Sequence, residues 1–422
     1  MLEKPKLFVR LTEFWFSMIF LSVLLFIRLF FLYGDYKEFK EKPLFYTDVQ
    51  VVQAYEKWKN DNYYTILKLY SPTLDLHFFS RTKIRSKDLT SKIRIKLFPH
   101  SDMKFLDYLG VPFIFSNVNH IYDEKKNTKA DFLYFIEKQH NDKDISSFYK
   151  AIYFATPLTK SLRESVSVLG VSHLIALSGF HLSILSALLF FLIRLVYRPL
   201  QQNFFPYRFD LYDIGFIVLL ILGFYVWFVG SPPSLLRSYV MLIAGWLLLV
   251  LGMELVSFSF LATIVLVLLV IFPKLMLSLA FWFSIAGVFY IFLLLQYFSH
   301  INKYLMTLLI SFGLFILMLP IVHTFFPLTS SLQLYSPILS LGFTFFYLIS
   351  IFLHLLGIGG LFDGYLKELF TLSTHIVAFK LEKSYLIVYL TLSFLSIYSR
   401  WLFYILSFIS ILFALWLFIL VL

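Results

Sequence analysis

The chain has 422 residues, of which 59% are hydrophobic and 14% charged, and this excludes an ordinary water-soluble protein, because so much apolar surface cannot be buried in a core of this size. It contains no cysteine, so disulfides, thiolate metal sites and cysteine nucleophiles are excluded as well. The net charge of +11 must lie in loops and in a soluble part, where it favours phosphate or anionic lipid as partners.

Residues 1–33 contain the first apolar run and predict a retained transmembrane helix. The run is too long for the core of a signal peptide, and no small-residue cleavage site follows it. Lys4, Lys6 and Arg10 precede or open the run, which favours a cytoplasmic amino terminus. Residues 34–170 are therefore expected on the outer side of the membrane.

Residues 34–126 have the composition of a soluble protein and predict a small all-β domain. Residues that favour strands alternate or cluster in five short segments, with Pro, Asn and Asp between them. Five short strands suit a small barrel such as an OB-fold. The five segments are residues 47–55, 63–70, 74–79, 92–98 and 112–118.

Residues 127–170 predict amphipathic connecting helices at the membrane surface, because apolar side chains recur there at helical spacing. Residues 171–422 predict a polytopic domain, and with the first helix the fold class is a multi-pass α-helical membrane protein of about ten transmembrane helices. Its apolar runs are residues 172–197, 213–230, 234–252, 256–272, 275–298, 304–326, 333–357, 384–398 and 400–422. Residues 364–379 are a weaker candidate, expected at the interface.

Cations recur at every second position in two neighbouring segments of the β domain. Period two places the members of each set on one face of a strand, and residues 88–91 are expected to form a hairpin turn between them. Such a ribbon of positive charge suits a polyphosphate backbone. The alternatives are a solvated strand face and a face that rests on anionic lipid headgroups. The candidate DNA-binding residues are Arg81, Lys83, Arg85, Lys87, Lys92, Arg94 and Lys96.

The first polar stretch of the membrane part surrounds the start of its first span. Gly179, Ser183 and Ala187 recur every four residues, a stripe that would let another helix approach closely. The dipeptide Ser178-Gly179 predicts a kink or break, with His173 and His181 on either side.

Three further interpretations of these side chains stay open. Ser178 and His181 would suit nucleophilic hydrolysis, although no orienting carboxylate is evident nearby. His173 and His181 would suit a metal site, although no third ligand is visible, so no metal or cofactor is expected. Both histidines would also serve as hydrogen-bonding groups between helices.

A second polar stretch lies between two apolar runs. Pro232 and Pro233 forbid a continuous helix, so a helix must restart near Ser234, which is expected to cap it. Arg237 lies one turn further on, where a cation in hydrocarbon is costly unless it faces water, a partner or phosphate. Together with Ser231 these residues would line a polar route. The alternative is an outside loop with a snorkelling arginine.

A third stretch, which opens just after Pro273, brings Ser278 and Ser284 into an apolar helix. We interpret both serines as further candidates to line the route.

These three stretches resemble the motifs of the ComEC-type competence proteins, the DNA-uptake channels of transformable bacteria. Residues 170–181 are similar to that family's Gly-hydrophobic-Ser-His-Leu-Leu-Ala-Ile-Ser-Gly-Leu-His signature. Residues 233–241 look like its Pro-Ser-x-x-Arg-Ala-x-x-Met element, with Ser238 in place of alanine. The stretch after Pro273 is also similar, but Trp282 stands where glutamine is usual, so no role of that glutamine is carried over.

The resemblance implies a non-enzymatic channel in the bacterial inner membrane that passes single-stranded DNA to the cytoplasm during natural transformation. It implies as partners a separate DNA receptor, a cytoplasmic ATP-driven motor, a separate nuclease, membrane lipids and a further copy of the chain. Many family members carry a metallo-β-lactamase-like domain, whose His-x-His-x-Asp-His cluster is missing here, so a short form is expected. The alternatives are a membrane-embedded hydrolase or transferase that uses Ser178 and His181, and a non-catalytic assembly protein.

Overall fold

The computed structural model describes residues 7–8, 10–59, 62–85, 91–100, 102–122, 128–253 and 257–421. The chain divides into two compact units. The β unit contains Phe8–Ala130 and Ala262–Phe281, and the helical unit contains Asp131–Leu261 and Trp282–Leu422.

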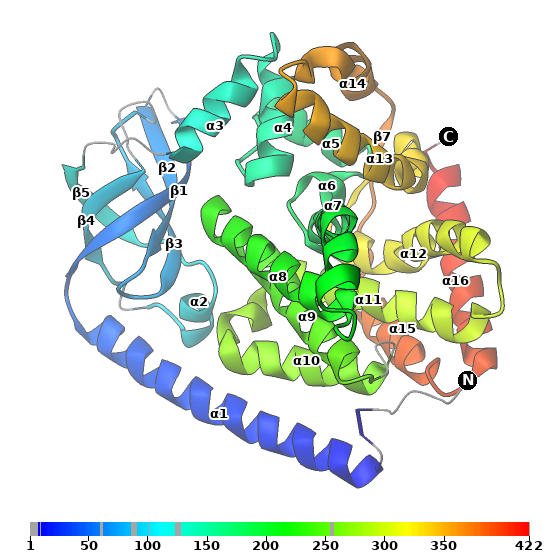
Figure 1. Cartoon of the computed structure of the whole chain (residues 1–422). Helices are drawn as coiled ribbons and strands as arrows, with labels where there is room; N and C mark the ends of the chain where they lie inside the picture. Colours follow the sequence, from blue (N-terminus) through cyan, green and yellow to red (C-terminus); the bar gives the residue numbers. More distant parts are fainter. Residues whose placement is uncertain are drawn as a thin grey trace. The chain divides into compact units, whose positions relative to one another are not determined.

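The β unit opens with a long apolar helix that leads directly into its sheet (Figure 1). Helix α1, Leu11–Glu41, exposes large apolar side chains such as Phe16 and Phe30, as expected of a helix surrounded by lipid. Strand β1, Phe45–Lys59, begins four residues after the helix ends.

The carboxyl-terminal turns of α1 belong to the soluble domain. Leu32, Tyr36 and Phe39 are buried in the apolar core beneath the sheet, and the Tyr36 hydroxyl donates a hydrogen bond to the carbonyl oxygen of Met103 over 2.6 Å. The predicted helix end at residue 33 is therefore wrong. The helix continues to Glu41 because its last turns exchange lipid for the interior of the β domain.

Five strands form one antiparallel sheet in the order β3-β2-β1-β4-β5. They lie at the five segments that the sequence predicts. Besides β1 they are β2 (Asn62–Ser71), β3 (Leu76–Thr82), β4 (Lys92–Phe98) and β5 (Phe115–Ile121).

The two edges of this sheet meet just before β5. The N–H of Phe79 donates to the carbonyl oxygen of Pro112 over 2.7 Å, and the N–H of Ile114 donates to the carbonyl oxygen of Phe79 over 2.8 Å. This parallel bridge joins β3 to the segment that enters β5, so the sheet curls around its apolar face. Inward-facing side chains of all but the last strand fill that face, and each is at most 1% exposed: Val49, Leu67, Leu69, Leu76, Phe78, Ile93, Ile95 and Leu97.

The two basic segments do not form the predicted hairpin. Strands β2 and β1 lie between β3 and β4, because β1 is 15 residues long and pairs with both β2 and β4. Strand β3 ends at Thr82, so Lys83 and Arg85 follow the strand instead of extending it. Lys87 and most of the predicted turn lie outside the described residues.

A segment from much later in the chain completes the β unit. The 3-10 helix η2, Pro273–Leu277, lies against α1 and against α2, Phe105–Leu109. Met276 packs on the apolar core, and Lys274 Nζ lies 3.0 Å from Asp75 Oδ2 in the turn between β2 and β3. The third polar stretch of the sequence therefore docks on the β domain.

The helical unit is built from helices of very different lengths. Short helices come first, and long apolar ones follow. They are α3 (Thr128–Glu137), α4 (Lys143–Phe154), α5 (Lys160–Val168), α6 (Ser172–Ile175), α7 (Gly179–Phe204), α8 (Asp210–Val229), α9 (Pro233–Val250), α11 (Leu279–Phe298), α12 (Lys303–Phe325), α13 (Ser336–Leu355), α14 (Asp363–Thr371), α15 (Lys383–Leu395) and α16 (Arg400–Ile419). Helix α10 (Phe258–Ile271) belongs mostly to the β unit.

Seven helices among the described residues are long and apolar enough to cross a membrane: α1, α7, α8, α11, α12, the continuous segment Ser331–Leu355 that contains α13, and α16. Three shorter apolar helices, α9, α10 and α15, bring the number to the predicted ten only if they cross as well. Helix α14 has nine residues and is too short to span, in keeping with the interfacial position predicted for this part of the chain.

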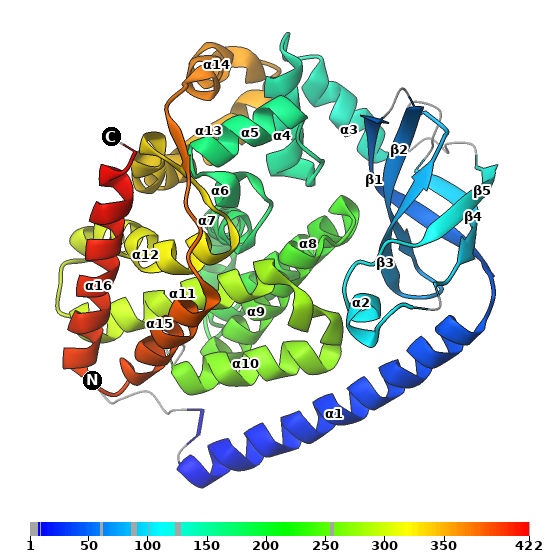
Figure 2. The same ribbon diagram turned by 180° about the vertical axis from the view of Figure 1, so that it is seen from behind.

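Three groups of helices share apolar cores within the helical unit. Helices α7, α8 and α9 pack around Leu177, Val218 and Leu235. Helices α4, α5 and α6 pack with α13 and α14 around Tyr149 and Leu174. Helices α12, α15 and α16 lie side by side (Figure 2). The first two groups position the candidate site.

Candidate functional site between two interrupted helices

The first predicted helix break is present at the start of the membrane part. Helix α6 ends at Ile175 and α7 begins at Gly179. Between them Ser178 is extended, with φ −136° and ψ 179°. The break leaves the carbonyl oxygen of Leu177 without a helical donor, so another element must satisfy it.

Ser178 and His181 make the contact of a helix cap. Ser178 is the residue that precedes α7, and His181 is the third residue of its first turn. His181 Nδ1 accepts a hydrogen bond from the Ser178 backbone N–H over 3.3 Å, and the Ser178 hydroxyl lies at the same distance from this nitrogen. The histidine thus takes the place that Glu or Gln holds in a capping box.

His181 is fully buried among aromatic side chains. Its ring meets the rings of Phe343 and Tyr347 edge-on, with centroids 5.3 and 5.0 Å away, and its Nε2 atom has no hydrogen-bond partner among the described residues. In a nucleophilic triad this second nitrogen would donate to an orienting carboxylate. Within the described part of the chain no group of three His, Asp or Glu side chains could hold a metal ion.

The second predicted break separates α8 from α9. Gly230 and Ser231 both have left-handed backbone, with φ of 100° and 49°, and the N–H groups of these residues bond back to the last turn of α8. This turn is a typical helix end at glycine. Pro232 precedes α9, and Pro233 is its first residue, where a missing N–H costs no hydrogen bond.

The two breaks are joined to each other. The prediction that Ser234 caps its own helix is wrong, because its hydroxyl donates to the carbonyl oxygen of Leu177 over 2.8 Å. Gly179 lies so close to α9 that a Cβ there would stand 2.8 Å from Ser238 Oγ. The break before α9 therefore supplies a hydrogen-bond donor to the break before α7, and the absence of a side chain at Gly179 allows α7 and α9 to approach closely.

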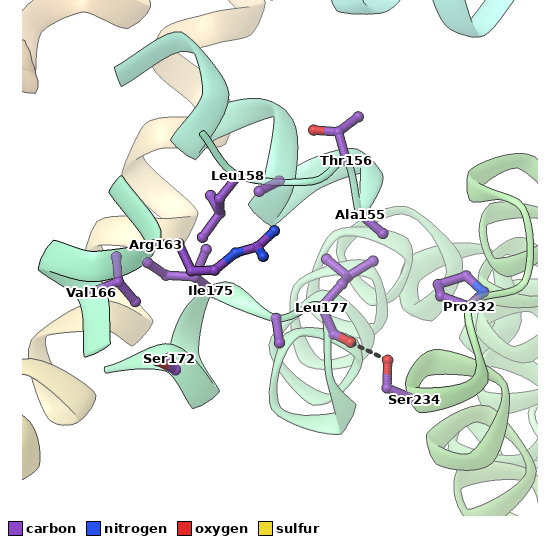
Figure 3. A pocket seen from close by; sticks show the side chains of 12 residues that line it. Ala155, Thr156, Leu158, Arg163, Val166, Ser172, Ile175, Leu177, Pro232 and Ser234 are labelled. Carbon is purple, nitrogen blue, oxygen red and sulfur yellow. Dashed lines mark hydrogen bonds between the residues drawn. The ribbon is translucent and has the colours of Figure 1, made fainter. Parts of the chain in front are cut away.

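A pocket of about 320 Å³ lies where these elements meet (Figure 3). Both breaks contribute to its wall, and so do α4, α5 and the loop between them. In Figure 3 the guanidinium group of Arg163, from α5, points into the pocket, while Ser234 turns toward Leu177. The lining residues are Ala151, Ala155, Thr156, Leu158, Arg163, Val166, Ser172, Ile175, Ala176, Leu177, Pro232 and Ser234.

Arg163 and Thr156 were missed by the sequence analysis. Leu162 and Val166 are buried and Arg163 is exposed, so α5 is an amphipathic helix with one cation beside its apolar stripe. This amphipathic spacing is visible in the sequence and could have identified Arg163 as a cation at the edge of an apolar helix face. Nothing in the local sequence shows that α5 faces the breaks around residues 177 and 232.

Other predicted residues lie elsewhere. His173 Nε2 is 3.2 Å from Ser340 Oγ of α13, which makes it a contact between helices. Ser183 and Ala187 are exposed, so the predicted close approach of a helix is present at Gly179 alone among the three described positions of the stripe.

Of the ten residues predicted to line the route, Ser234 alone is in the described lining of this pocket. Ser178, Gly179, His181 and Ser231 lie outside it, and so do the three residues that follow, while the side chain of Pro233 is outside the described part of the structure. Arg237 is buried in the second turn of α9. Ser278 belongs to the β unit, where its hydroxyl accepts from the N–H of Phe281 over 3.3 Å. Ser284 is exposed on α11.

The cations of β4 lie on the outer surface of the sheet beside aromatic rings. Lys96 Nζ is 5.7 Å from the ring centroid of Tyr46 on β1, and Lys92 Nζ is 5.0 Å from that of Tyr122. Arg94 lies between them on the same face. Asp48 is the acidic neighbour of this group, and a hydrogen bond from the Tyr122 hydroxyl holds the pKa of Asp48 below its usual range.

Two of the other basic residues, Arg81 and Arg85, lie over aromatic rings of β2. Arg81 lies 5.8 Å from the ring of Tyr64, and Arg85 lies 5.9 Å from the ring of Tyr63. The β domain therefore has two groups of cations beside aromatic rings, one at β4 and one at β2 and β3. They are apart because β1 lies between β2 and β4 in the sheet.

Comparison with known protein families identifies the family of this chain. A family profile described as "Competence protein" matches residues 155–422, which is more than half of the chain. The chain belongs to the competence protein family. Membership indicates a role in DNA uptake during transformation and, with the apolar helices, an integral membrane protein. Searches of curated proteins and of solved structures found no match. The matched region of this competence protein includes both breaks and most of the pocket lining.

Proposed function

We propose that this competence protein is a channel of the bacterial inner membrane that passes single-stranded DNA to the cytoplasm. The observation that carries the proposal is the pocket formed by two interrupted helices at once. Irregular polar backbone at membrane depth is tolerated where it lines a cavity that water or a polar ligand enters. A family of DNA-uptake proteins makes a nucleic-acid strand the natural occupant.

The electrostatics of the pocket suit a phosphate backbone. Arg163 points into it, and Pro232 and Ser234, at the start of α9, line its wall. A helix start carries a partial positive charge, which favours an anion. At about 320 Å³ the pocket lies at the lower end of the range of small-ligand sites, roughly 300–1,000 Å³, so passage of a strand requires it to widen. Such widening would break the hydrogen bond between Ser234 and Leu177, which joins the two breaks.

We further propose that the β domain gathers the strand outside the membrane. An OB-like barrel is supported by five strands, by the order β3-β2-β1-β4-β5 and by the bridge between its edges. Cations beside aromatic rings are the surface that binds single strands with little sequence preference, since phosphates meet charge and bases stack.

The hydrolase alternative gains no support from the Ser178–His181 contact, which has the geometry of a helix cap. We propose accordingly that the protein is not an enzyme, and that a motor, a receptor and a nuclease are separate proteins. A Ser178→Ala change that abolished turnover of a lipid or peptide and left DNA uptake intact would favour the hydrolase.

The assembly-protein alternative makes a different prediction. If the β domain only docks on lipid, charge reversal at Arg81, Lys83 and Arg85 would alter membrane attachment and leave DNA import normal. The channel proposal expects the same triple change to lower DNA import.

The proposal is tested by deleting the gene and following labelled DNA in competent cells. We expect labelled DNA to accumulate outside the inner membrane without entering the cytoplasm, and expression of the intact chain to restore entry. Entry at the normal rate in the deletion strain would overturn the channel assignment.

A further inference from the structure

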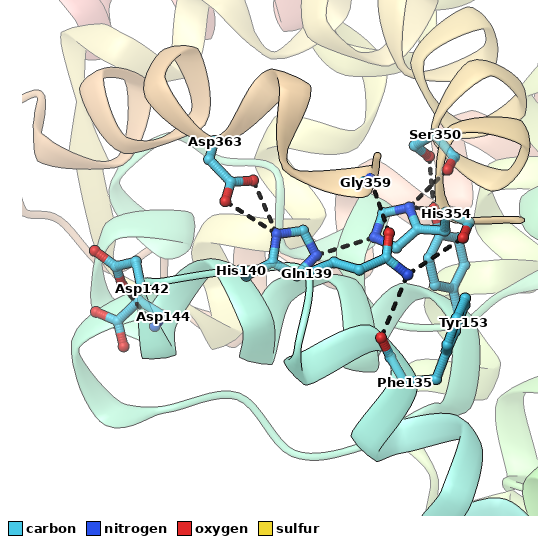
Figure 4. Close-up of polar contacts among 10 residues, drawn as sticks. All are labelled: Phe135, Gln139, His140, Asp142, Asp144, Tyr153, Ser350, His354, Gly359 and Asp363. Carbon is cyan, nitrogen blue, oxygen red and sulfur yellow. Dashed lines mark hydrogen bonds and ion pairs between the residues drawn. The ribbon is translucent and has the colours of Figure 1, made fainter. Parts of the chain in front are cut away.

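Two buried histidines face each other in the helical unit, away from the pocket. His140 lies between α3 and α4, and His354 lies near the end of α13. Their Nε2 atoms are 3.0 Å apart, and the side chain of His140 is completely inaccessible to solvent (Figure 4).

Each ring uses its other nitrogen on an acceptor. His140 Nδ1 lies 2.9 and 3.0 Å from the two carboxylate oxygens of Asp363, the first residue of α14. His354 Nδ1 lies 2.6 Å from the carbonyl oxygen of Ser350, which can only accept. The hydroxyl of Tyr153, 3.4 Å from the same nitrogen, donates its own proton to Ser350 Oγ over 2.7 Å.

These contacts require one proton more than the ordinary ionisation supplies. The three hydrogen bonds, Asp363 to His140, His140 to His354 and His354 to Ser350, each need a proton from the trio Asp363, His140 and His354. A carboxylate and two neutral imidazoles hold only two protons. With two, the Nε2 lone pairs of both rings would face each other at 3.0 Å, which is repulsive.

We propose that His140 and His354 form a proton-binding site, in which a third proton makes the trio with Asp363 electrically neutral and clamps α13 and α14 to the corner between α3 and α4. The carboxylate supplies the countercharge that a buried imidazolium needs. This clamp is defined by His140, His354 and Asp363.

Among the groups around the clamp, Asp363 is the one that balances the charge of the imidazolium. Tyr149 stacks on His140 with ring centroids 4.5 Å apart, and burial raises the pKa values of Tyr149 and Tyr153, so both stay neutral. Charged groups of the packed elements pair with each other: Asp142 of the α4 cap with Lys367 of α14 over 3.4 Å, and Glu137 of α3 with Lys150 of α4 over 2.6 Å.

Two neutral residues hold the clamp in place. The Gln139 side chain donates to the carbonyl oxygen of His354 over 3.2 Å and accepts from the N–H of Gly359 over 2.8 Å. A Cβ at Gly359 would stand 2.6 Å from His354 Nε2, so only glycine fits there.

Helix α4 connects the clamp to the pocket, because it has residues in both. Tyr149 and Tyr153 of this helix face the histidines, while Ala151 lines the pocket. Release of the third proton would therefore loosen the wall that α4 gives to the pocket.

The test is thermal unfolding of the full chain in detergent as a function of pH. The folded chain holds a proton that histidines of the unfolded chain release above about pH 6.5. Stability from the clamp is then present at lower pH and is lost as the pH rises. We expect Asp363→Asn, which removes the countercharge, to move this loss to lower pH by roughly one unit or more.

The matched control is Asp142→Asn, which keeps the cap of α4 and removes a carboxylate outside the clamp; above about pH 5, where this carboxylate stays ionised, its pH profile should follow that of the unchanged chain. Nitrogen-15 spectra of histidine-labelled protein give a direct reading, since a protonated pair has an imidazolium signal that His354→Gln removes. Identical pH profiles for the unchanged chain and Asp363→Asn, or spectra with neutral rings only, would overturn the proposal. So would one tightly bound metal ion per chain whose removal by a chelator lowers the Tm.

Discussion

The hydroxyl of Ser234 donates a hydrogen bond to the carbonyl oxygen of Leu177 over 2.8 Å, and so connects the two interrupted helices of the competence domain. The carbonyl is free to accept because the helix break at residues 176–178 removes its helical donor. The serine is free to donate because Pro232, and not Ser234, precedes α9. This bond crosses the wall of the pocket that we place on the DNA path.

Ser234→Ala is expected to lower the stability of the chain by about 1 kcal/mol, since it leaves the Leu177 carbonyl without its donor. Thermal unfolding in detergent measures the change. Ser231→Ala is the matched control, because Ser231 is exposed and its hydroxyl lies 3.5 Å from the carbonyl oxygen of Val226, at the limit of a hydrogen bond. Equal effects of the two changes would contradict the role given to Ser234.

Gly179→Ala is expected to destabilise the chain by about 1–3 kcal/mol, because the new Cβ would lie 2.8 Å from Ser238 Oγ. Ser238→Ala in the same chain should recover part of the loss, since it removes this nearest atom and leaves a Cβ at 3.1 Å. Gly287→Ala is the control, because none of the described atoms lies within 4 Å of a Cβ there. A loss as large at Gly287, or no recovery by the double change, would count against close packing of α7 on α9.

The outer face of β4 is expected to bind single-stranded DNA through both charge and stacking. Replacing Lys92, Arg94 and Lys96 with glutamine should weaken binding and lower the slope of log K against log salt by about 0.7 for each phosphate that is no longer neutralised. Tyr46→Ala should weaken binding by about 1–3 kcal/mol for a stacked base and leave the slope unchanged.

Titrations of the full chain with labelled oligonucleotides at several salt concentrations measure both effects. Lys303→Gln, which removes an exposed cation at the start of α12 in the helical unit, is the control. Unchanged binding after the triple replacement would remove the β4 face from the DNA path.

Acidification is expected to destabilise the strands β2 and β3. Burial, aided by Lys68 and Lys274, lowers the pKa of His77 to about 4. Below about pH 6.5 the unfolded chain therefore binds a proton that the folded chain does not, so stability falls as the pH decreases from about 6.5 to 4.

Amide hydrogen exchange of β2 and β3 in the full chain measures this loss. His77→Phe, which keeps the stacked contact with Tyr70, should flatten the dependence. A dependence that persists unchanged in this variant would assign it to other groups.

Local chemistry made much of the fold predictable. Pro232 and Pro233 allow few backbone conformations, so the restart of a helix there follows from the sequence, and Gly179 at a break follows in the same way. The five strands were predictable because alternating burial is a local pattern. The helix end at Glu41 was not, because the apolar side chains of α1 look alike whether lipid or a protein core covers them.

The features that could not be predicted depend on contacts between residues far apart in the sequence. The basic segments at β3 and β4 are close in sequence, and a hairpin was the simplest prediction, but the long strand β1 and its partner β2 separate them. His140 and Asp363 are 223 positions apart, and neither belongs to a local motif. Arg163 enters the pocket only because α5 folds against the two breaks.

The central claim is that DNA passes through the pocket between the two breaks, and cross-linking tests it most directly. Because the chain has no cysteine, Ser172→Cys in the pocket lining introduces a single thiol. Ala187→Cys, on the exposed face of α7 outside the lining, is the matched control. Competent cells that carry either variant would be given DNA with thiol-reactive groups on its backbone. We expect a covalent DNA adduct at position 172 and none at 187; an adduct at neither position, with uptake intact, would contradict the account.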